Sequence, residues 1–482
     1  MSIRQSNLPN LNQPKEIIAG SRLVNWERVL RIAIVLGLFP SVMVIAILQT
    51  RFNPLYGLIV SFLPFIVVGV EILLRRFNLA ILLLLITAAF TPISLPTGTG
   101  SRLVDSLIVT IMLLAFWVIR MVAIDRKISI QPYPSNLPLI LFCVVILISL
   151  GWSVIFRDPF VKTWESFPFV QIASTLVMLA LPAAFLYVAN HVKEARILNY
   201  MVILMGIAGV IGLFEHFSGL NLQIDSLGLF SMWVVGLTLA AVLFERRIPP
   251  LWRFVLALLP IGWFYWGMIL NITWLAGWMP NAMVLLIMVF MRSKRLLALM
   301  GVFFVIFAII KIDYFISAVE DEKQESGSTR LAAWQMNWLI TKDHLLFGTG
   351  PAGYAAYYMS YFPSQAMATH SNYIDIVAQT GVVGFILNAW FFISLAWYGF
   401  KLSLRLKGRG DMLEGLANAS FAGTVGCIVM MAFGDWLYPF AYTQTISGFD
   451  YAVYNWIFMA FIPVIDRLTQ PTAGSPELSH AA

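Results

Sequence analysis

Hydrophobic residues in this chain occur in runs of about 20 that are separated by short polar segments. An α-helix rises about 1.5 Å per residue, so a run of this length crosses the roughly 30 Å hydrocarbon core of a bilayer. The pattern predicts about fourteen spans. They are expected at residues 29–48, 55–74, 79–90, 103–123, 137–155, 169–189, 197–217, 228–244, two within 251–291 with a turn near Asn271, 296–317, 374–400, 416–436 and 448–465. The expected fold is therefore all-α, a polytopic transmembrane bundle of about 12–14 spans with one large external loop.

Charge in the connecting segments predicts the orientation of these helices. Basic residues gather in alternate segments, which the positive-inside rule places in the cytoplasm. These segments contain Arg75–Arg76, Arg126–Lys127, Lys193–Arg196, Arg246–Arg247, Arg292–Arg295 and Lys401–Arg409. Both termini are then cytoplasmic. The expected organisation is a cytoplasmic tail (1–28), about eleven spans (29–317), an external catalytic loop (318–373), about three spans (374–467) and a cytoplasmic tail (468–482).

Composition excludes a soluble protein, because 60% of the residues are hydrophobic and only 11% are charged. A soluble domain carries about 25% charged residues. The net charge of +7 comes from the cytoplasmic loops and indicates topology rather than nucleic-acid binding. The 2 cysteines, Cys143 and Cys427, lie in apolar runs and predict small core residues rather than a disulfide or metal site. No motif for a cofactor or metal is present in the sequence.

The external loop has the composition of a folded segment. It opens with acidic residues from Glu320 to Glu325, and the spacing of Leu331–Ile340 then predicts a helix. Glycines at 348, 350 and 353 predict a turn, and the tyrosines of 354–361 are expected to anchor the loop at the membrane surface. Long ordered loops on a rigid scaffold commonly carry function.

An ordered set of motifs in and after this loop resembles a known family. Arg330 is followed four residues later by Trp334, and then come His344–Pro351 (HLLFGTGP), Thr369–Tyr373 (THSNY) and Gly381–Gly384 (GVVG). This set resembles the signature of the O-antigen ligase and O-antigen polymerase superfamily. The resemblance implies a metal-independent, inverting glycosyltransferase at the outer face of the plasma (inner) membrane. Such an enzyme transfers glycan from an undecaprenyl-diphosphate carrier to a glycan or lipid acceptor during lipopolysaccharide or exopolysaccharide biosynthesis.

Two residues of the loop suit this chemistry. The guanidinium of Arg330 offers paired donors to a departing diphosphate, and His370 can take the proton of an acceptor hydroxyl. Each residue also has a purely structural interpretation. Arg330 is then a solvated residue at the start of a helix whose charge balances the acidic residues before it, and His370 caps the next helix. Residues assigned to substrate binding are Lys342, His344, Asn372, Trp334 and Gly350. The expected partners are the lipid-linked donor, the acceptor and the bilayer, with no nucleic acid and no cofactor.

The sequence departs from the family pattern in three places. Gln379 stands where the family has Glu, and neither 271–278 nor 220–233 contains the Arg expected there. Three explanations remain open for the missing arginines: other cations of the chain replace them, the substrate differs from that of the family, or this chain has lost activity. The candidate replacements are Arg102, Arg157, Lys162 and Lys342. Ligase and polymerase activities are equally compatible with the motifs. Two other functions also remain open: a transporter or flippase for a lipid-linked or small polar substrate, and a non-catalytic binding protein.

Overall fold

The computed structural model describes residues 77–470, apart from 91–93, 97–101, 221, 223, 225, 272–274, 314–315, 318–319, 321–327, 365–366 and 445. The chain divides into two units, Met1–Arg76 and Phe77–Ala482. The predicted spans at 29–48 and 55–74 belong to the first unit and lie outside the described residues, as do the N-terminal tail and residues 471–482.

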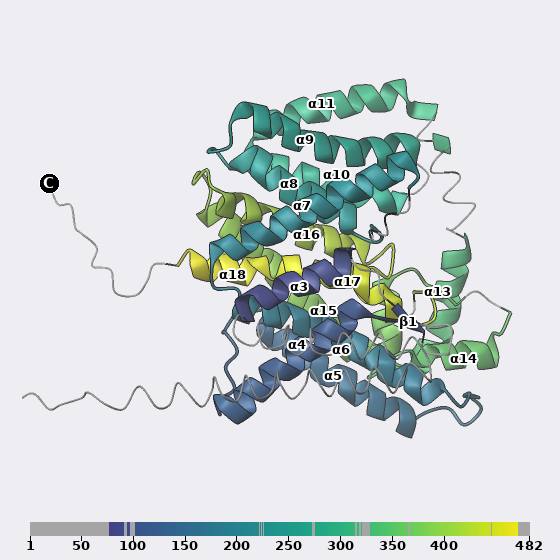
Figure 1. The fold of residues 1–482 in the computed structure, drawn as a ribbon. Helices are drawn as coiled ribbons and strands as arrows, with labels where there is room; N and C mark the ends of the chain where they lie inside the picture. The colour runs from purple at the N-terminus through teal and green to yellow at the C-terminus, as the bar shows by residue number, and fades with distance from the viewer. Residues whose placement is uncertain are drawn as a thin grey trace, which may run out of the picture. The chain divides into compact units, whose positions relative to one another are not determined.

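The second unit is built almost entirely from helices (Figure 1). Its first half comprises α3 (Phe77–Phe90), β1 (Ser94–Pro96), β2 (Arg102–Val104), α4 (Asp105–Ile119), η1 (Arg120–Ile124), α5 (Asn136–Ile155), α6 (Phe167–His191), α7 (Ala195–Ser218) and α8 (Phe230–Phe244). Its second half comprises α9 (Pro250–Phe264), η2 (Tyr265–Leu270), α10 (Leu275–Arg292), α11 (Lys294–Ile310), α13 (Ser328–Thr341), η4 (Lys342–His344), α14 (Gly353–Tyr361), α15 (Asn372–Arg405), α16 (Met412–Met430), η5 (Ile446–Gly448), α17 (Phe449–Met459) and α18 (Phe461–Leu468).

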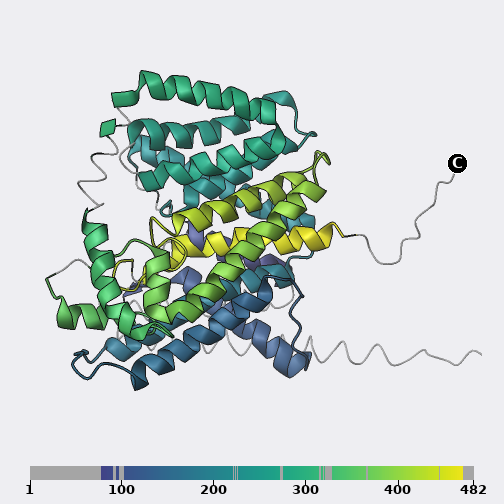
Figure 2. The same cartoon turned by 180° about the vertical axis from the view of Figure 1, so that it is seen from behind.

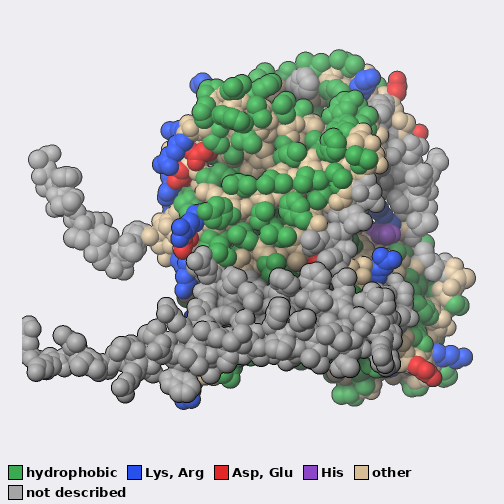
Figure 3. Space-filling model, in the orientation of Figure 1, with side chains coloured by type: hydrophobic (Ala, Val, Ile, Leu, Met, Phe, Trp, Pro, Cys, Tyr) green, Lys and Arg blue, Asp and Glu red, His purple; other side chains and the backbone are tan. Residues whose placement is uncertain are grey.

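The predicted all-α membrane fold is confirmed. Eight described helical segments are long and apolar enough to cross a bilayer, and three shorter apolar helices accompany them. Strands among the described residues are limited to the antiparallel pair β1–β2. Large apolar side chains cover the visible sides of α7 and α9–α11 (Figure 3), as expected for helices that face lipid.

The structure confirms the expected turn near Asn271 but not the expected end of the span 416–436. The turn near Asn271 is confirmed, because η2 ends at Leu270 and α10 begins at Leu275. The expected span 416–436 is wrong at its end, since α16 stops at Met430 and the chain then runs without regular helix to residue 444. The segment after Met430 contains Asp435 and Pro439 and is less apolar than a span. Its backbone amides at Leu437 and Tyr438 bond instead to the side chain of Asn372.

The helices at the centre of the unit are packed most tightly. α8 packs against α10 and α16, and α15 lies between α5 and α16 (Figure 2). α17 is wholly buried, and α18 is buried from Phe461 to Ile465. The indole Nε1 of Trp233 on α8 donates to Asn455 Oδ1 on α17 over 2.6 Å, which fixes these two helices in register. α13 and α14 lie at one end of the helices, and α18 finishes at the other (Figures 1 and 2).

Basic side chains gather at the end opposite α13 and α14 (Figure 3). The loops there contain Arg126–Lys127, Lys193–Arg196, Arg246–Arg247, Arg292–Arg295 and Lys401–Arg409. The predicted alternation of basic loops therefore corresponds to one physical end of the bundle. That is the distribution expected of a cytoplasmic end, so it supports the predicted orientation.

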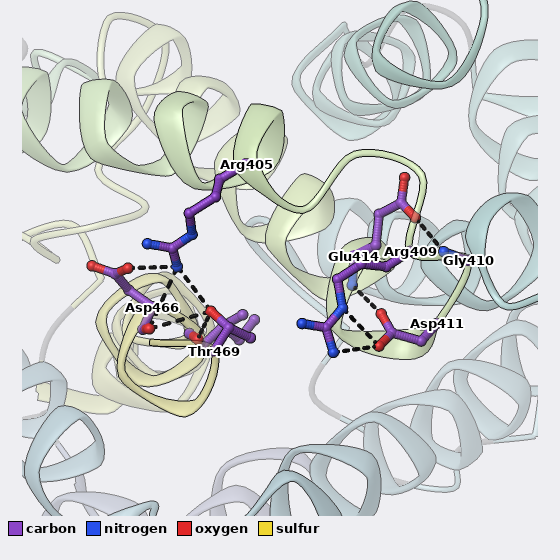
Figure 4. A network of polar contacts seen from close by, with 8 residues as sticks. Arg405, Arg409, Gly410, Asp411, Glu414, Asp466 and Thr469 are labelled. Atoms are coloured by element: carbon purple, nitrogen blue, oxygen red, sulfur yellow. Dashed lines mark hydrogen bonds and ion pairs between the residues drawn. The ribbon is translucent and has the colours of Figure 1, made fainter. Parts of the chain in front are cut away.

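A polar network closes the loop between α15 and α16 at this basic end (Figure 4). Glu414 accepts from the backbone N–H of Gly408 (2.8 Å) and of Gly410 (2.6 Å). Asp411 caps α16 by accepting from the N–H of Glu414 over 3.0 Å. Arg405 pairs with Asp466 at 2.7 Å and donates to Thr469 at 2.8 Å, which ties α15 to the end of α18.

Replacement of Glu414 is expected to destabilise this loop. Glu414→Ala leaves the N–H groups of Gly408 and Gly410 without their acceptor, at a cost of about 2–3 kcal/mol. Thermal unfolding of detergent-solubilised protein measures the change. Glu414→Gln is the matched control, because its side-chain oxygen still accepts one bond and a smaller loss is expected. Equal melting temperatures for wild type and Glu414→Ala would contradict the assignment.

Candidate active site

The predicted loop helix at Leu331–Ile340 is confirmed as α13. The expectation that the four tyrosines of 354–361 anchor the loop at the membrane surface is wrong for three of them. Tyr354 and Tyr358 are fully buried on α14 because each hydroxyl has an internal acceptor, Asp375 Oδ1 (2.8 Å) and the Ala333 carbonyl (2.6 Å) respectively. Tyr357 is buried as well, whereas Tyr361 is exposed. α14 is thus a core element that supports the loop.

The glycine turn of the loop packs against a kink in α15. Gly381 has φ 70° and ψ −174°, which interrupts the helix. The kink frees the carbonyls of Ala378 and Gln379, which accept from the N–H groups of Thr349 (2.8 Å) and Gly350 (3.0 Å). Gly350 has φ 81°, and a Cβ there would lie 2.4 Å from Ser153 Oγ. Gly350 is therefore buried and shapes the turn.

Gln379, which departs from the family pattern, has a defined structural partner. Its Oε1 accepts from the backbone N–H of Ala352 over 2.8 Å. A glutamate oxygen could accept the same bond, so this departure leaves the contact between α15 and the turn intact.

His370 has a strained backbone conformation that its neighbours maintain. Its φ is 48°, in the left-handed region that costs a non-glycine residue about 1 kcal/mol. The indole Nε1 of Trp334 donates to the Thr369 carbonyl over 2.7 Å. The Thr369 hydroxyl donates to Asp375 Oδ1 over 2.6 Å. Trp334, assigned to substrate binding from the sequence, thus holds the backbone next to His370.

The charges of Arg330 and His370 converge on one buried residue, Asp435. Asp435 is 1% exposed and lies in the non-helical segment after α16. Burial raises the pKa of Asp435, while the charges of His370 and Arg330 act in the opposite direction. The two residues predicted to be catalytic are 40 positions apart in the sequence, yet both lie near this carboxyl group.

Sequence reasoning missed Asp375 and Asp435. Asp435 was assigned to the end of an expected span, and Asp375 received no role. A usable signal was present, because an acidic residue within an apolar stretch is costly and commonly functional. The electrostatic effect of His370 and Arg330 on Asp435 depends on the fold of residues 431–444 and could not be obtained from the sequence.

The other residues assigned to substrate binding, Asn372, Lys342 and His344, differ in their burial. Asn372 is buried, and its amide bonds to the backbone of Leu437 and Tyr438, so it anchors the segment that carries Asp435. Lys342 is exposed on η4. His344 is half-buried against Tyr357, with ring centroids 5.0 Å apart. Burial lowers the pKa of His344, although nearby carboxylates raise it.

Two of the possible replacement cations lie in the segment between α5 and α6, which is tied to α14. The Tyr361 hydroxyl donates to Asp158 Oδ2 over 2.7 Å, and the backbone N–H of Lys162 donates to Ser360 Oγ over 2.9 Å. The neighbouring Arg157 lies over the Phe167 ring, 5.2 Å from its centroid. Cations from outside the loop therefore reach the same end of the bundle.

A comparison with protein families finds a match over residues 217–389 to the family described as O-antigen ligase. The matched range contains α13, α14 and the kinked beginning of α15, with Arg330 and His370. It ends before Asp435. No curated protein matches the chain.

Proposed function

We propose that this chain, whose residues 217–389 match the O-antigen ligase family, transfers glycan from an undecaprenyl-diphosphate carrier to an acceptor hydroxyl. The hydrogen bond from Trp334 to the Thr369 carbonyl carries the proposal, because it brings the helix that contains Arg330 against the segment that contains His370. A cation for a departing diphosphate and an imidazole for an acceptor proton are the two groups that this reaction requires.

The reaction is a direct displacement at the anomeric carbon of the donor. The acceptor oxygen attacks that carbon and forms the new glycosidic bond. The bond from the carbon to the diphosphate oxygen breaks, and the undecaprenyl diphosphate leaves with the electron pair. Arg330 stabilises the negative charge that grows on the diphosphate, and His370 takes the proton from the acceptor hydroxyl.

The position of the site suits a donor with a lipid tail and a polar head. The site lies at one end of apolar helices, where a diphosphate and a glycan avoid the hydrocarbon core while the tail remains in lipid. The basic loops at the opposite end support a plasma-membrane orientation with cytoplasmic termini and a periplasmic or extracellular site.

Further residues divide into two roles in this proposal. Trp334 holds the backbone next to His370, Asn372 anchors the segment that carries Asp435, and Gly350 shapes the turn that packs against α15. Lys342 and His344 lie on η4 and are available for donor phosphates, and Arg157 is a further cation at the same end. Several cations rather than one would then bind the diphosphate.

A transfer assay with the purified full chain tests the proposal. The protein in nanodiscs receives undecaprenyl-diphosphate oligosaccharide in EDTA, with and without a lipid-core acceptor. Product that requires the core acceptor indicates a ligase, and longer carrier-linked chains without it indicate a polymerase. Movement of lipid-linked glycan across liposomes without a new glycosidic bond would overturn the proposal in favour of a flippase.

Removal of the Arg330 guanidinium is expected to lower kcat/KM for transfer about 100-fold or more, because one charge-assisted partner of the leaving group is lost. Initial rates of Arg330→Ala in nanodiscs measure the effect. Arg196→Ala is the matched control, since its guanidinium is exposed at the basic end of the bundle and pairs with Glu194. A rate for Arg330→Ala equal to that of Arg196→Ala would remove Arg330 from the site.

A further inference from the structure

A groove lies between α7, α8 and α9, in the half of these helices nearest to the basic end of the bundle. The three helices pack side by side (Figure 1). Its lining comes from α7 between Asn199 and Ile211, from α8 and its end between Leu237 and Glu245, and from α9 between Val255 and Leu259. The groove has a volume of about 660 Å³, which is in the range of a ligand site.

The lining of the groove is apolar except near the basic end. Two of its three polar side chains, Asn199 and Glu245, lie at that end. Ile203 and Val210 line the groove and are 56% and 55% exposed, so the described part of the chain leaves the groove accessible from the side of the bundle. An apolar groove on the side of a membrane bundle faces lipid.

The groove is about as long as one leaflet of a bilayer is thick. The segment of α7 from Asn199 to Ile211 rises about 18 Å at about 1.5 Å per residue. Half of a hydrocarbon core of roughly 30 Å is about 15 Å. Tyr200 and Trp252 are 48% and 60% exposed close to the starts of α7 and α9, where aromatic residues mark the headgroup level. The groove therefore suits a lipid of the leaflet at the basic end, whereas the donor diphosphate of the proposed reaction lies at the opposite end.

The mouth of the groove carries positive charge. Arg246 and Arg247 directly follow Glu245, and both are exposed. Arg253 is held beside the groove, because its Nε donates to the carbonyl of the lining residue Ile248 over 2.9 Å. Glu245 Oε1 accepts from the backbone N–H of Arg247 over 3.0 Å. Within the described part of the chain, no carboxylate forms an ion pair with Arg247 or Arg253. Basic residues at such a position attract anionic lipid headgroups.

We propose that this groove binds one acyl chain of a phospholipid with an anionic headgroup, and that Arg247 and Arg253 bind the headgroup phosphate. A zwitterionic phospholipid offers the same chain and the same phosphate, but its own cation opposes the arginines, so the anionic lipid binds more tightly. The groove is separate from the candidate active site, and the inference does not depend on the proposed glycan transfer.

Native mass spectrometry of the delipidated full chain in detergent tests the proposal. Phosphatidylglycerol and phosphatidylcholine with identical acyl chains are titrated separately, and wild type is expected to bind phosphatidylglycerol about fivefold more tightly or better.

Gly206→Leu fills the groove and is expected to weaken the binding of both lipids about tenfold or more. Gly206 lines the groove, and a Cβ there meets nothing within 4 Å, so the leucine occupies the space of the acyl chain without displacing protein atoms. Gly151→Leu is the matched control and is expected to bind as wild type does. It places the same side chain on α5, where a Cβ also meets nothing within 4 Å, and α5 lines no part of the groove.

Arg247→Gln tests the headgroup contact separately from the acyl chain. Loss of this charge is expected to weaken phosphatidylglycerol binding about fivefold and to leave phosphatidylcholine binding nearly unchanged. Because Arg247 is exposed, the variant keeps the fold of wild type. Lys127→Gln removes one exposed positive charge from a loop at the same end that lines no part of the groove, and wild-type binding is expected.

Four results would overturn the proposal. Wild type binds the two lipids equally, or Gly206→Leu binds phosphatidylglycerol as wild type does. Undecaprenyl phosphate displaces phosphatidylglycerol from wild type at a lower concentration than phosphatidylglycerol itself requires, which assigns the groove to the donor lipid. Wild type is a dimer that Gly206→Leu dissociates, which assigns the groove to a second copy of the chain.

Discussion

His370→Ala is expected to lower glycan transfer by about 100- to 10,000-fold, the range that a positioned general base contributes. The acceptor hydroxyl must lose its proton as the glycosidic bond forms. The charge of His370 acts on the buried Asp435, and no other histidine among the described residues does so. The measurement is kcat for transfer in nanodiscs over a range of pH.

The backbone of His370 dictates the choice of control variants. With φ at 48°, alanine adds strain at this position, whereas glycine and asparagine tolerate left-handed conformations. His370→Gly and His370→Asn therefore remove the imidazole with little change in the backbone. If the imidazole carries the reaction, all three variants lose activity to a similar degree. Activity retained by His370→Gly or His370→Asn would instead show that the conformation of the segment matters and the ring does not.

Gly381→Ala is expected to destabilise the protein by about 3 kcal/mol or more and to abolish transfer. The backbone at Gly381, with φ 70° and ψ −174°, lies in a region that is essentially restricted to glycine. A Cβ at this position would lie 2.2 Å from the Leu346 carbonyl oxygen and 2.4 Å from its carbon. Backbone atoms cannot yield as a side chain can. The helix must straighten or the glycine turn must move away.

Either change removes the bonds from Thr349 and Gly350 to the carbonyls of Ala378 and Gln379. The thermal melting temperature and the rate of transfer report the two consequences separately. Gly151→Ala is the matched control, because Gly151 lies within α5 and a Cβ there meets nothing within 4 Å. A neutral or slightly stabilising effect is expected for it. Wild-type melting of Gly381→Ala would contradict the role given to the kink.

The periodic and compositional features of the sequence were sufficient to predict the class of fold. Runs of apolar residues predicted the spans, and alternating basic loops predicted that basic side chains gather at one end (Figure 3). The spacing of Leu331–Ile340 predicted α13, and the motif around Arg330 predicted the resemblance to the O-antigen ligase family, whose model matches residues 217–389. These properties are local, since hydrophobic length and charge reflect the surroundings of a segment whatever its distant partners are.

The tertiary structure decided how those segments meet. Gly381 lies within an apparently ordinary helix, and its kink arises because a turn 30 residues earlier needs two free carbonyls. Residues 431–444 form no regular helix, and Asn372 Oδ1 accepts from the backbone N–H groups of Leu437 and Tyr438 in this segment, which also carries Asp435. Tyr354 is buried because Asp375 accepts its hydroxyl. Each of these outcomes depends on a partner distant in the sequence, and local pattern contains no information about which partner a residue will find.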